Sequence, residues 1–361
     1  MKSLISSGGL AALTISALLA MNCNCEKEAA EYIGPSDIKI TDGKMTPEVL
    51  LSFGRLSDPQ LSPDGKTILY GVSYTSIEDN RTCRNLFVVN VDGTSPRQLT
   101  KDGKSISCAR WTNGNTITYI QGGQIWKATV RGLSGDNPKL VKRTQLSNVP
   151  NGIGEFKLSP DEKSLMYISY VKSDVKTAKD SDPKLDKADA YVAEDLMYRH
   201  WDHWVTELPH TFVAKLGSEI TPDNSIDILA NEEKLYELPT EPHGGLEQLD
   251  WTPDGKYIAY SCKKKTGKEY AFSTNTEIYI YNVADGTCTV IPMGGGYDTN
   301  PVWSPDGKKI VWLSMARDGY EADKSRLMAA DFNNGEISNI RDLTADFKYN
   351  AAGPVWADDS E

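Results

Sequence analysis

Histidine is scarce in this 361-residue chain, which contains only four. All four lie from His200 to His243, so the last 118 residues contain none. An α/β-hydrolase triad, which follows the chain order Ser, Asp, His, therefore has no histidine near the carboxyl end to use. The nucleophile motif G-x-S-x-G is missing as well, because the nearest strings, at 103–107 and 132–136, do not complete it. We accordingly predict no catalytic residue in this chain.

The chain also lacks an excess of basic residues. Its formal net charge is −11, which would repel the phosphates of a nucleic acid, so no nucleic-acid partner is predicted. The apolar run Leu10 to Ala20 is too short to span a bilayer. Since it follows Lys2 and precedes small residues, residues 1–25 are predicted to be a secretory signal. The protein is thus expected to be exported, to the periplasm or the cell envelope.

Two of the six cysteines belong to this signal region. Cys23 and Cys25 lie where a lipoprotein signal places its acylated cysteine, but Asn22 and Asn24 are poor residues to precede such a site. Simple cleavage and lipidation both stay open. A lipidated Cys23 or Cys25 is the membrane anchor that the sequence suggests.

The other four cysteines are Cys83, Cys108, Cys262 and Cys288. In an oxidising compartment they permit two disulfides in any of three connectivities. Cys262 and Cys288 fall within one repeat and are able to bridge, while buried free thiols are the alternative. No pair has the spacing of metal ligands, and we predict neither a metal nor a cofactor.

What the sequence does contain is one turn, built several times. LSPDGKTILY at 61–70 returns as WTPDGKYIAY at 251–260 and WSPDGKKIVW at 303–312. Pro presets φ, Asp follows and Gly ends the turn, which is close to an ideal type I turn. The β-branched and aromatic runs on its flanks predict a hairpin. A second hairpin turn follows at Asp92-Gly93, Asp285-Gly286 and Asn334-Gly335, so each unit has four strands.

These units recur with a period typical of a β-propeller. The first turns align at Ser62, Thr112, Ser159, Thr252, Ser304 and Ala357, and most steps are 47 to 53 residues. Four strands per unit at this spacing predict an all-β fold of four-stranded antiparallel blades. The chain offers about five complete blades plus the first strand of a sixth. Either the ring closes with five blades and a stub, or this is the front part of a longer protein.

Two segments interrupt the regular repeat. The step from Ser159 to Thr252 is about double, which predicts that blade 3 carries an insertion at about 172–245. Residues 26–55 form an N-terminal segment in which Thr46-Pro47-Glu48 predicts the start of a short helix and Gly54 its end. The propeller itself is expected over residues 56–361.

Several strings resemble a known family. MTPEVLLSFGRLSDPQLSPDGKTILYGVS at 45–73 and NLFVVNVDGTSPRQLT at 85–100 resemble the start of exported bacterial peptidases of the prolyl oligopeptidase family. DLMYRHWDHW at 195–204 and HTFVAKL at 210–216 resemble its dipeptidyl-peptidase 5 branch more specifically. The similarity extends from about Met45 to the end of the chain.

The resemblance implies a function for the propeller. In that family it is followed by an α/β-hydrolase domain with a serine, aspartate and histidine triad, and it gates access and helps to dock the amino terminus of an oligopeptide. The implied partners are therefore a peptide N-terminus and a hydrolase domain that this sequence does not show. The chain alone is expected to be inactive. The alternative is a freestanding periplasmic propeller of the TolB type that binds a protein partner or a ligand.

The predicted peptide contacts lie in the insertion. Glu194 and Asp195 are candidates for binding the free ammonium group, because carboxylates add charge-assisted hydrogen bonds, and Tyr198 and Arg199 accompany them. In the related dipeptidyl peptidases this excursion is directed toward the active site. The alternative is that Glu194 and Asp195 merely cap a short helix over Leu196 to Trp204.

The neighbouring residues are predicted to be structural. His200 and Asp202, with Arg199, are expected to form an ion and hydrogen-bond network, with Trp201 and Trp204 packed beneath it. The spacing of these residues fits no known zinc motif. The tryptophans that precede the blade turns occupy the same place in each repeat and are predicted to fill the wedges between sheets: Trp111, Trp251, Trp303 and Trp356.

Overall fold

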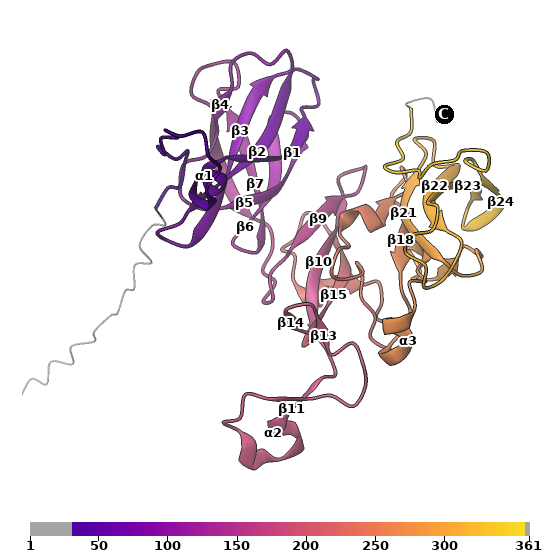
Figure 1. Ribbon diagram of the computed structural model, residues 1–361. Coiled ribbons are helices and arrows are strands. Elements are labelled where there is room, and N and C mark those ends of the chain that lie inside the picture. Colours follow the sequence, from indigo (N-terminus) through magenta and orange to yellow (C-terminus); the bar gives the residue numbers. More distant parts are fainter. Residues whose placement is uncertain (1–30, 358–361) are drawn as a thin grey trace, which may run out of the picture.

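The structure, a computed structural model, describes residues 31–357 (Figure 1). The predicted signal segment, with Cys23 and Cys25, lies outside the described residues. No helix within residues 31–357 has the length and apolar character needed to cross a bilayer. The expected short helix is present as α1 (Pro47–Ser52): the Thr46 hydroxyl accepts the backbone N–H of Val49 at 3.3 Å, and Pro47 lies in the first turn.

Five four-stranded antiparallel sheets confirm the propeller prediction, and in each the strands pair in chain order. We call the sheets blades 1 to 5. Blade 1 contains β1 (Arg55–Leu61), β2 (Thr67–Ser76), β3 (Arg81–Asn90) and β4 (Arg97–Gln98). Blade 2 contains β5 (Ile106–Thr112), β6 (Thr116–Gln121), β7 (Gln124–Arg131) and β8 (Lys139–Gln145). Blade 3 contains β9 (Glu155–Leu158), β10 (Ser164–Lys172), β15 (Glu207–Lys215) and β16 (Ser225–Asp227). Blade 4 contains β17 (Leu249–Trp251), β18 (Tyr257–Cys262), β19 (Glu277–Asn282) and β20 (Cys288–Val290). Blade 5 contains β21 (Tyr297–Trp303), β22 (Lys309–Met315), β23 (Arg326–Asn333) and β24 (Glu336–Asp342).

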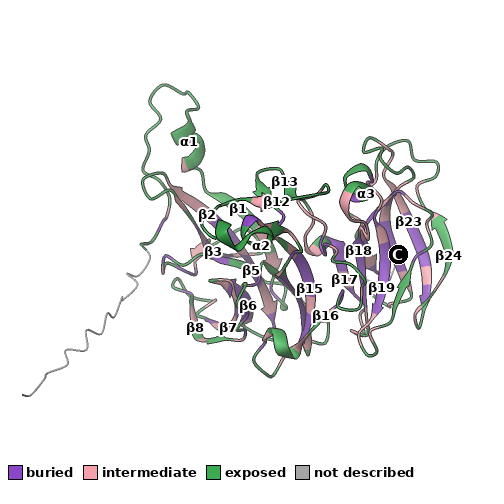
Figure 2. Ribbon diagram, turned by 90° about the horizontal axis from the view of Figure 1, so that it is seen from below, coloured by how far each residue is buried: buried purple, intermediate pink, exposed green. Residues whose placement is uncertain are grey.

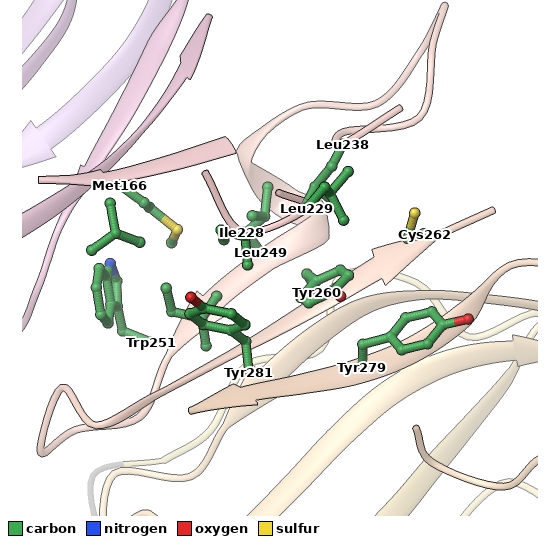
Figure 3. Close-up of a cluster of buried hydrophobic side chains, with 12 residues drawn as sticks. Met166, Ile228, Leu229, Leu238, Leu249, Trp251, Tyr260, Cys262, Tyr279 and Tyr281 are labelled. Atoms are coloured by element: carbon green, nitrogen blue, oxygen red, sulfur yellow. The ribbon is translucent and has the colours of Figure 1, made fainter. Parts of the chain in front are cut away.

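The hydrophobic core lies between the sheets. Four buried clusters fill the four spaces between consecutive blades, and Figure 3 shows the one between blades 3 and 4. In β10, Met166 belongs to the cluster shared with blade 4, whereas the next residue, Tyr167, belongs to the cluster shared with blade 2. Because a middle strand is covered on both faces, its sequence is a continuous apolar run rather than an alternating one.

The repeated turn has the same hydrogen bonds in four blades. At the first, the Ser62 hydroxyl donates to Asp64 at 2.7 Å and accepts the backbone N–H of Thr67 at 2.9 Å. Ser159, Thr252 and Ser304 repeat both contacts in blades 3, 4 and 5. The fourth turn residue has a left-handed φ of 68° at Gly65, which explains the preference for glycine. The turn is thus a hydrogen-bonded unit, independent of the packing around it.

Three of the repeat tryptophans donate a hydrogen bond to the preceding blade, whereas the buried indole Nε1 of Trp303 has no partner within residues 31–357. The indole Nε1 of Trp111 donates to the carbonyl of Gln60 at 3.3 Å, and that of Trp251 donates to the carbonyl of Lys157 at 3.4 Å. Residues 351–357 form no strand, yet Trp356 donates in the same way to the carbonyl of Val302 at 3.2 Å. The segment after blade 5 therefore continues the repeat at the position where a next first strand is expected.

Antiparallel pairing gives the sheets two distinct ends. Connections between strands 1 and 2 and between strands 3 and 4 lie at one end, which we call the turn face; it carries the repeated turns and η2 (Pro222–Asn224). Connections between strands 2 and 3, and from one blade to the next, lie at the other end, which we call the insert face. Its long connections are 173–206, 228–248, 263–276 and 316–325.

The interval 172–245, expected to be one insertion, is divided by β15 and β16. The segment 173–206, which we call the insert, carries β11 (Lys176–Thr177), α2 (Ala178–Ser181), η1 (Pro183–Leu185), β12 (Tyr191–Val192), β13 (Arg199–His200) and β14 (His203–Trp204). Figure 1 shows its α2 arm reaching away from the sheets. Figure 2 shows the contrast in burial, since β18 is largely buried while α1 and α2 are largely exposed. The following segment, 228–248, returns to blade 4 through η3 (Leu246–Gln248).

Candidate functional site

The insert leaves and re-enters blade 3 through one hairpin stem. Lys172 at the end of β10 pairs with Glu207 at the start of β15. The next pair is also bonded, because the backbone N–H of Ser173 donates to the carbonyl of Thr206 at 2.9 Å. The buried Ser173 hydroxyl donates in addition to the carbonyl of Val205 at 2.7 Å. The base of the insert is therefore fixed at the insert face.

The segment that carries the predicted site residues forms a small hairpin. β13 and β14 pair with each other, so the alternative of a helix over 196–204 is wrong. Met197 and Trp201 have left-handed φ values of 60° and 41°, which bulky side chains rarely adopt. The guanidinium Nε of Arg199 donates to the carbonyl of Trp201 at 2.8 Å and holds this strained turn.

Aromatic rings gather on this hairpin. Trp204 lies 5.1 Å from Tyr191 and 6.0 Å from Tyr198 between ring centroids, and the guanidinium of Arg199 lies 5.5 Å from the centre of its ring. Trp201 does not pack beneath a network as expected, because its side chain is 74% exposed. The Trp201 ring contacts the His243 ring in an edge-to-face arrangement, with 4.8 Å between the two centroids.

The expected network of Arg199, His200 and Asp202 has different partners. Asp202 accepts from its exposed neighbour His203 at 3.2 Å, whereas His200 is buried and its Nε2 lies 2.7 Å from Glu237. Glu237 belongs to the 228–248 connection, so this contact ties the insert to the approach to blade 4. The sequence interpretation missed Glu237. A carboxylate inside the apolar string LYELP was the available signal of a buried partner.

Glu237 is the centre of a buried polar group. Its carboxylate also accepts the hydroxyl of Tyr270, from α3 (Gly267–Phe272), and the backbone N–H of Glu241 at 3.1 Å. Three segments therefore meet at one carboxylate: the insert, the 228–248 connection and α3. Such a carboxylate is held in place by donors on several sides, and its position does not depend on a ligand.

Burial shifts the pKa values of groups around Glu237. Burial, with the nearby Glu237 carboxylate second, raises the pKa of Tyr270 well above its ordinary value. Burial also raises the pKa of Tyr170 to about 12, and Glu241, which accepts its hydroxyl at 3.1 Å, adds to the shift. Burial lowers the pKa of Lys263, and Glu237 and Asp318 oppose this shift. Charge is thus held here in a partly dehydrated environment.

Two adjoining hollows open on this part of the insert face. The first, which we call the Glu207 hollow, has a volume of about 350 Å³ and is lined by Tyr170, His200, Trp204, Glu207, Glu237 and Glu241 among others. The second, which we call the Trp201 hollow, has a volume of about 580 Å³ and is lined by Trp201, Glu241, His243, Glu247, Lys263 and Glu321 among others. Glu241 lines both. Carboxylates beside aromatic rings in an open hollow are suited to binding a cation.

The predicted ammonium ligands Glu194 and Asp195 are exposed and line neither hollow. Asp195 lies against Gly267 at the start of α3, so closely that a Cβ at Gly267 would collide with its carboxylate. The peptide-binding roles of Glu194, Asp195, Tyr198 and Arg199 stay predictions. The position of Asp195 shows that the insert touches blade 4 a second time.

The four histidines have partners other than serine within residues 31–357. His200 contacts Glu237, His203 contacts Asp202, His210 lies 2.8 Å from Asp227, and His243 contacts Trp201. The buried Nε2 of His210 has no partner. In the same residues, no group of three or more His, Cys, Asp or Glu side chains is arranged to hold a metal. Cys262 and Cys288 do not bridge, and all four described cysteines are free thiols.

Comparisons with known proteins agree with this architecture. No family model matches the chain. In sequence it is 40% identical over 342 residues to dipeptidyl-peptidase 5 of Porphyromonas gingivalis, covering 92% of this chain and 48% of that protein. It is also 40% identical over 319 residues to dipeptidyl-peptidase 5 of Porphyromonas endodontalis, covering 87% and 45%. The chain thus spans about half the length of the curated relatives it matches.

A solved structure shows the same fold. The acylaminoacyl peptidase of Pyrococcus horikoshii superposes with a TM-score of 0.56 at 16% identity, covering 84% of this chain and 41% of that one. At this identity the likeness shows the fold alone, while the sequence matches carry the relationship. The resemblance found in the sequence is therefore confirmed: this chain is a β-propeller similar to about half of dipeptidyl-peptidase 5, a peptidase of the prolyl oligopeptidase family.

Proposed function

We propose that this chain is the propeller of a dipeptidyl-peptidase-like protein. In that role it controls the access of oligopeptide substrates and docks their free amino terminus. The observation that carries the proposal is the Glu207 hollow, where Glu207, Glu237 and Glu241 line one opening on the insert face. We further propose that the protein is exported, on the strength of the signal predicted over residues 1–25.

A terminal ammonium group has three N–H donors, and a fixed set of carboxylates is the partner that satisfies them. Glu237 is already oriented by Tyr270 and by the backbone of Glu241. Glu241 is oriented in turn by the Tyr170 hydroxyl. Little side-chain entropy is then lost on binding, because these acceptors are ordered beforehand.

Docking of the amino terminus would also fix which peptide bond of the substrate a peptidase cleaves. A main chain extends by about 3.3 to 3.6 Å per residue, so an anchored ammonium group places each following peptide bond at a set distance. An anchor on a rigid propeller would present the same bond of every substrate to a catalytic group. The location of the anchor, rather than side-chain identity, would then select dipeptide removal.

The test compares binding of tetra-alanine and Nα-acetyl-tetra-alanine to the purified chain by isothermal titration calorimetry. We expect the free amine to bind at least about tenfold more tightly, since acetylation removes the charge. Glu207→Gln and Glu241→Gln should each weaken free-amine binding by about tenfold. Glu219→Gln, an exposed glutamate on the turn face, is the matched control and should change nothing. Equal binding of the two peptides would overturn the proposal.

A further inference from the structure

We infer that the Trp201 hollow is a second binding site, which takes a basic side chain, lysine or arginine, of the same peptide. This inference rests on the proposed docking of the amino terminus and adds a side-chain preference to it. The carrying observation is the combination of three carboxylates and one outward-facing indole around a volume of about 580 Å³.

The two hollows are neighbours. Glu241 lines both, so a ligand that fills the Glu207 hollow ends beside the opening of the Trp201 hollow. A lysine side chain and one residue of extended main chain each span several ångströms. Either is long enough to pass Glu241 from the Glu207 hollow into the Trp201 hollow. A peptide anchored by its amino group therefore brings a side chain from its first residues to this place.

Carboxylates outnumber cations in the lining. Glu241, Glu247 and Glu321 face one lysine, Lys263, and none of the three glutamates forms an ion pair in the part of the chain that the structure describes. Repulsion between these carboxylates is relieved by an incoming cation, while an acidic side chain would increase it. The lining thus selects for positive charge.

Lys263 compensates the lining only in part: Glu321 acts on its charge, but its ammonium group also has partners outside the lining carboxylates. It donates to the carbonyl of Ser273 at 2.7 Å and lies 4.0 Å from the centre of the Tyr270 ring. These contacts turn it toward α3 and the residues after it. One lysine therefore offsets only part of the negative charge of Glu241, Glu247 and Glu321.

The floor of the hollow is ordered in advance. Glu247 accepts the backbone N–H of Gly245 at 2.9 Å through one oxygen, which leaves the second oxygen as an acceptor. The same connection is braced where Gly244 donates to the carbonyl of Thr240 at 2.8 Å, and where Thr240 donates to the side chain of Gln248 at 2.8 Å. A site built on such a loop keeps its shape without ligand.

Trp201 supplies the aromatic surface. Its indole is 74% exposed, although large aromatic rings usually lie buried in a fold. The left-handed backbone at Trp201 and the edge contact with His243 direct it to this position. The Arg199 guanidinium lies over Trp204 instead, and among residues 31–357 no lysine or arginine lies over the Trp201 ring. Tryptophan is the strongest cation–π partner among the side chains.

The experiment measures binding of four peptides, each with a free amine and in Nα-acetylated form, to the purified chain. The peptides are Lys-Gly-Gly-Gly, Gly-Lys-Gly-Gly, and the same two with norleucine in place of lysine. Norleucine keeps the length and removes the charge. We expect at least one lysine peptide to bind about tenfold more tightly than its norleucine counterpart. Trp201→Ala and the double variant Glu247→Gln/Glu321→Gln should reduce this ratio to about twofold or less, whereas Glu219→Gln should preserve it.

The outcomes separate the two proposals. If free-amine peptides bind better than acetylated ones but lysine and norleucine bind equally, the basic-side-chain site is wrong and amino-terminal docking stands. A lysine preference that survives in both Trp201 hollow variants also overturns the site. If acetylation has no effect on any of the four peptides, docking itself fails and the inference fails with it.

Discussion

The turn face and the insert face differ in how they treat charge. On the turn face, Asp64 and Asp161 are exposed, and hydrogen bonds from Ser62 and Ser159 lower the pKa of each carboxyl. In the buried polar group of the insert face, burial raises the pKa of Tyr270 and Tyr170 and lowers that of Lys263, so that charge is disfavoured on these three side chains.

The difference is also one of sequence distance between the interacting groups. In the repeated turns of the turn face, the polar groups bond to one another within five residues and stabilise a hairpin. Insert-face polar groups come from separate segments, as in the contact between His200 and Glu237, 37 residues apart. Ionisable side chains whose burial is unfavourable, and whose positions are set by several segments, are typical of binding sites.

The largest effect should come from breaking the insert-face group. Glu237→Ala removes the buried acceptor of His200 and leaves the Tyr270 hydroxyl only the more distant carbonyl of Glu241, at 3.3 Å. It should lower the free energy of unfolding by about 3 kcal/mol. Urea unfolding at pH 7 measures it. Glu219→Ala on the turn face should change the value by less than about 0.5 kcal/mol. A similar small change for both would mean that the two faces are energetically alike.

A pH series should distinguish a buried insert-face carboxyl from an exposed turn-face carboxyl by the sign of its effect on stability. Burial raises the pKa of Asp298, at the insert-face end of β21, to about 6. The folded state then binds this proton more tightly than the unfolded state, so stability falls as pH rises from about 4 to above 6. The Asp298→Asn variant does not lose stability in this way. The difference between its free energy of unfolding and that of the unsubstituted protein should therefore rise by up to about 3 kcal/mol between pH 4 and pH 7.

Asp64 on the turn face is the matched control for that series. Its carboxyl has a lowered pKa, so its contribution is present above the unfolded pKa and is lost as the pH falls through the folded pKa. Asp64→Asn should therefore destabilise the protein at pH 7 and have less effect in acid. Unfolding curves with the same sign for both variants would contradict the contrast.

Two glycines with similar backbones sharpen the comparison further. Gly65 on the turn face has a φ of 68° and an open surrounding, so Gly65→Ala should cost about 1 kcal/mol from backbone strain alone. Gly267 has a φ of 59° but lies against Asp195, and Gly267→Ala should cost about 2 kcal/mol. Thermal unfolding gives both values. In an Asp195→Ala background the two costs should become equal; a persistent excess at Gly267 would refute the steric explanation.

The smallest effects should test the uniformity of the turn face. Ser62→Ala, Ser159→Ala and Ser304→Ala each remove a hydroxyl that donates to an aspartate and accepts a backbone N–H. Each should lower the free energy of unfolding by about 1 kcal/mol. Agreement within about 0.5 kcal/mol in urea unfolding is the expected outcome, and one strongly deviating blade would show that the repeats are not equivalent.

The propeller could be predicted because its signals are local and repeated. The turn from Ser62 to Gly65 has a recognisable sequence, and its recurrence sets the number of blades. The helix start at Thr46 and Pro47 is equally local. Trp251 and Trp303, assigned to the core because they share a repeat position, are 4% and 5% exposed. Neighbouring residues and periodicity are sufficient for such assignments.

The candidate site depends on contacts without periodicity. Nothing near His200 in the sequence identifies Glu237 as its partner, since the pairing requires the 228–248 connection to fold back against the insert. Glu207 and Glu241 likewise meet only after two connections are placed side by side. Of the string YRHWD, only His200 lines the Glu207 hollow, and the other lining residues lie outside it.

The stem at Lys172 and Glu207 has a consequence for how such proteins diversify. Because the 34 residues at 173–206 begin and end on paired positions, β10 and β15 keep their register whatever lies between them. A change of length or sequence in this segment therefore leaves the pairing of the blade 3 strands in place, and the insert can vary in evolution independently of the sheets that carry it.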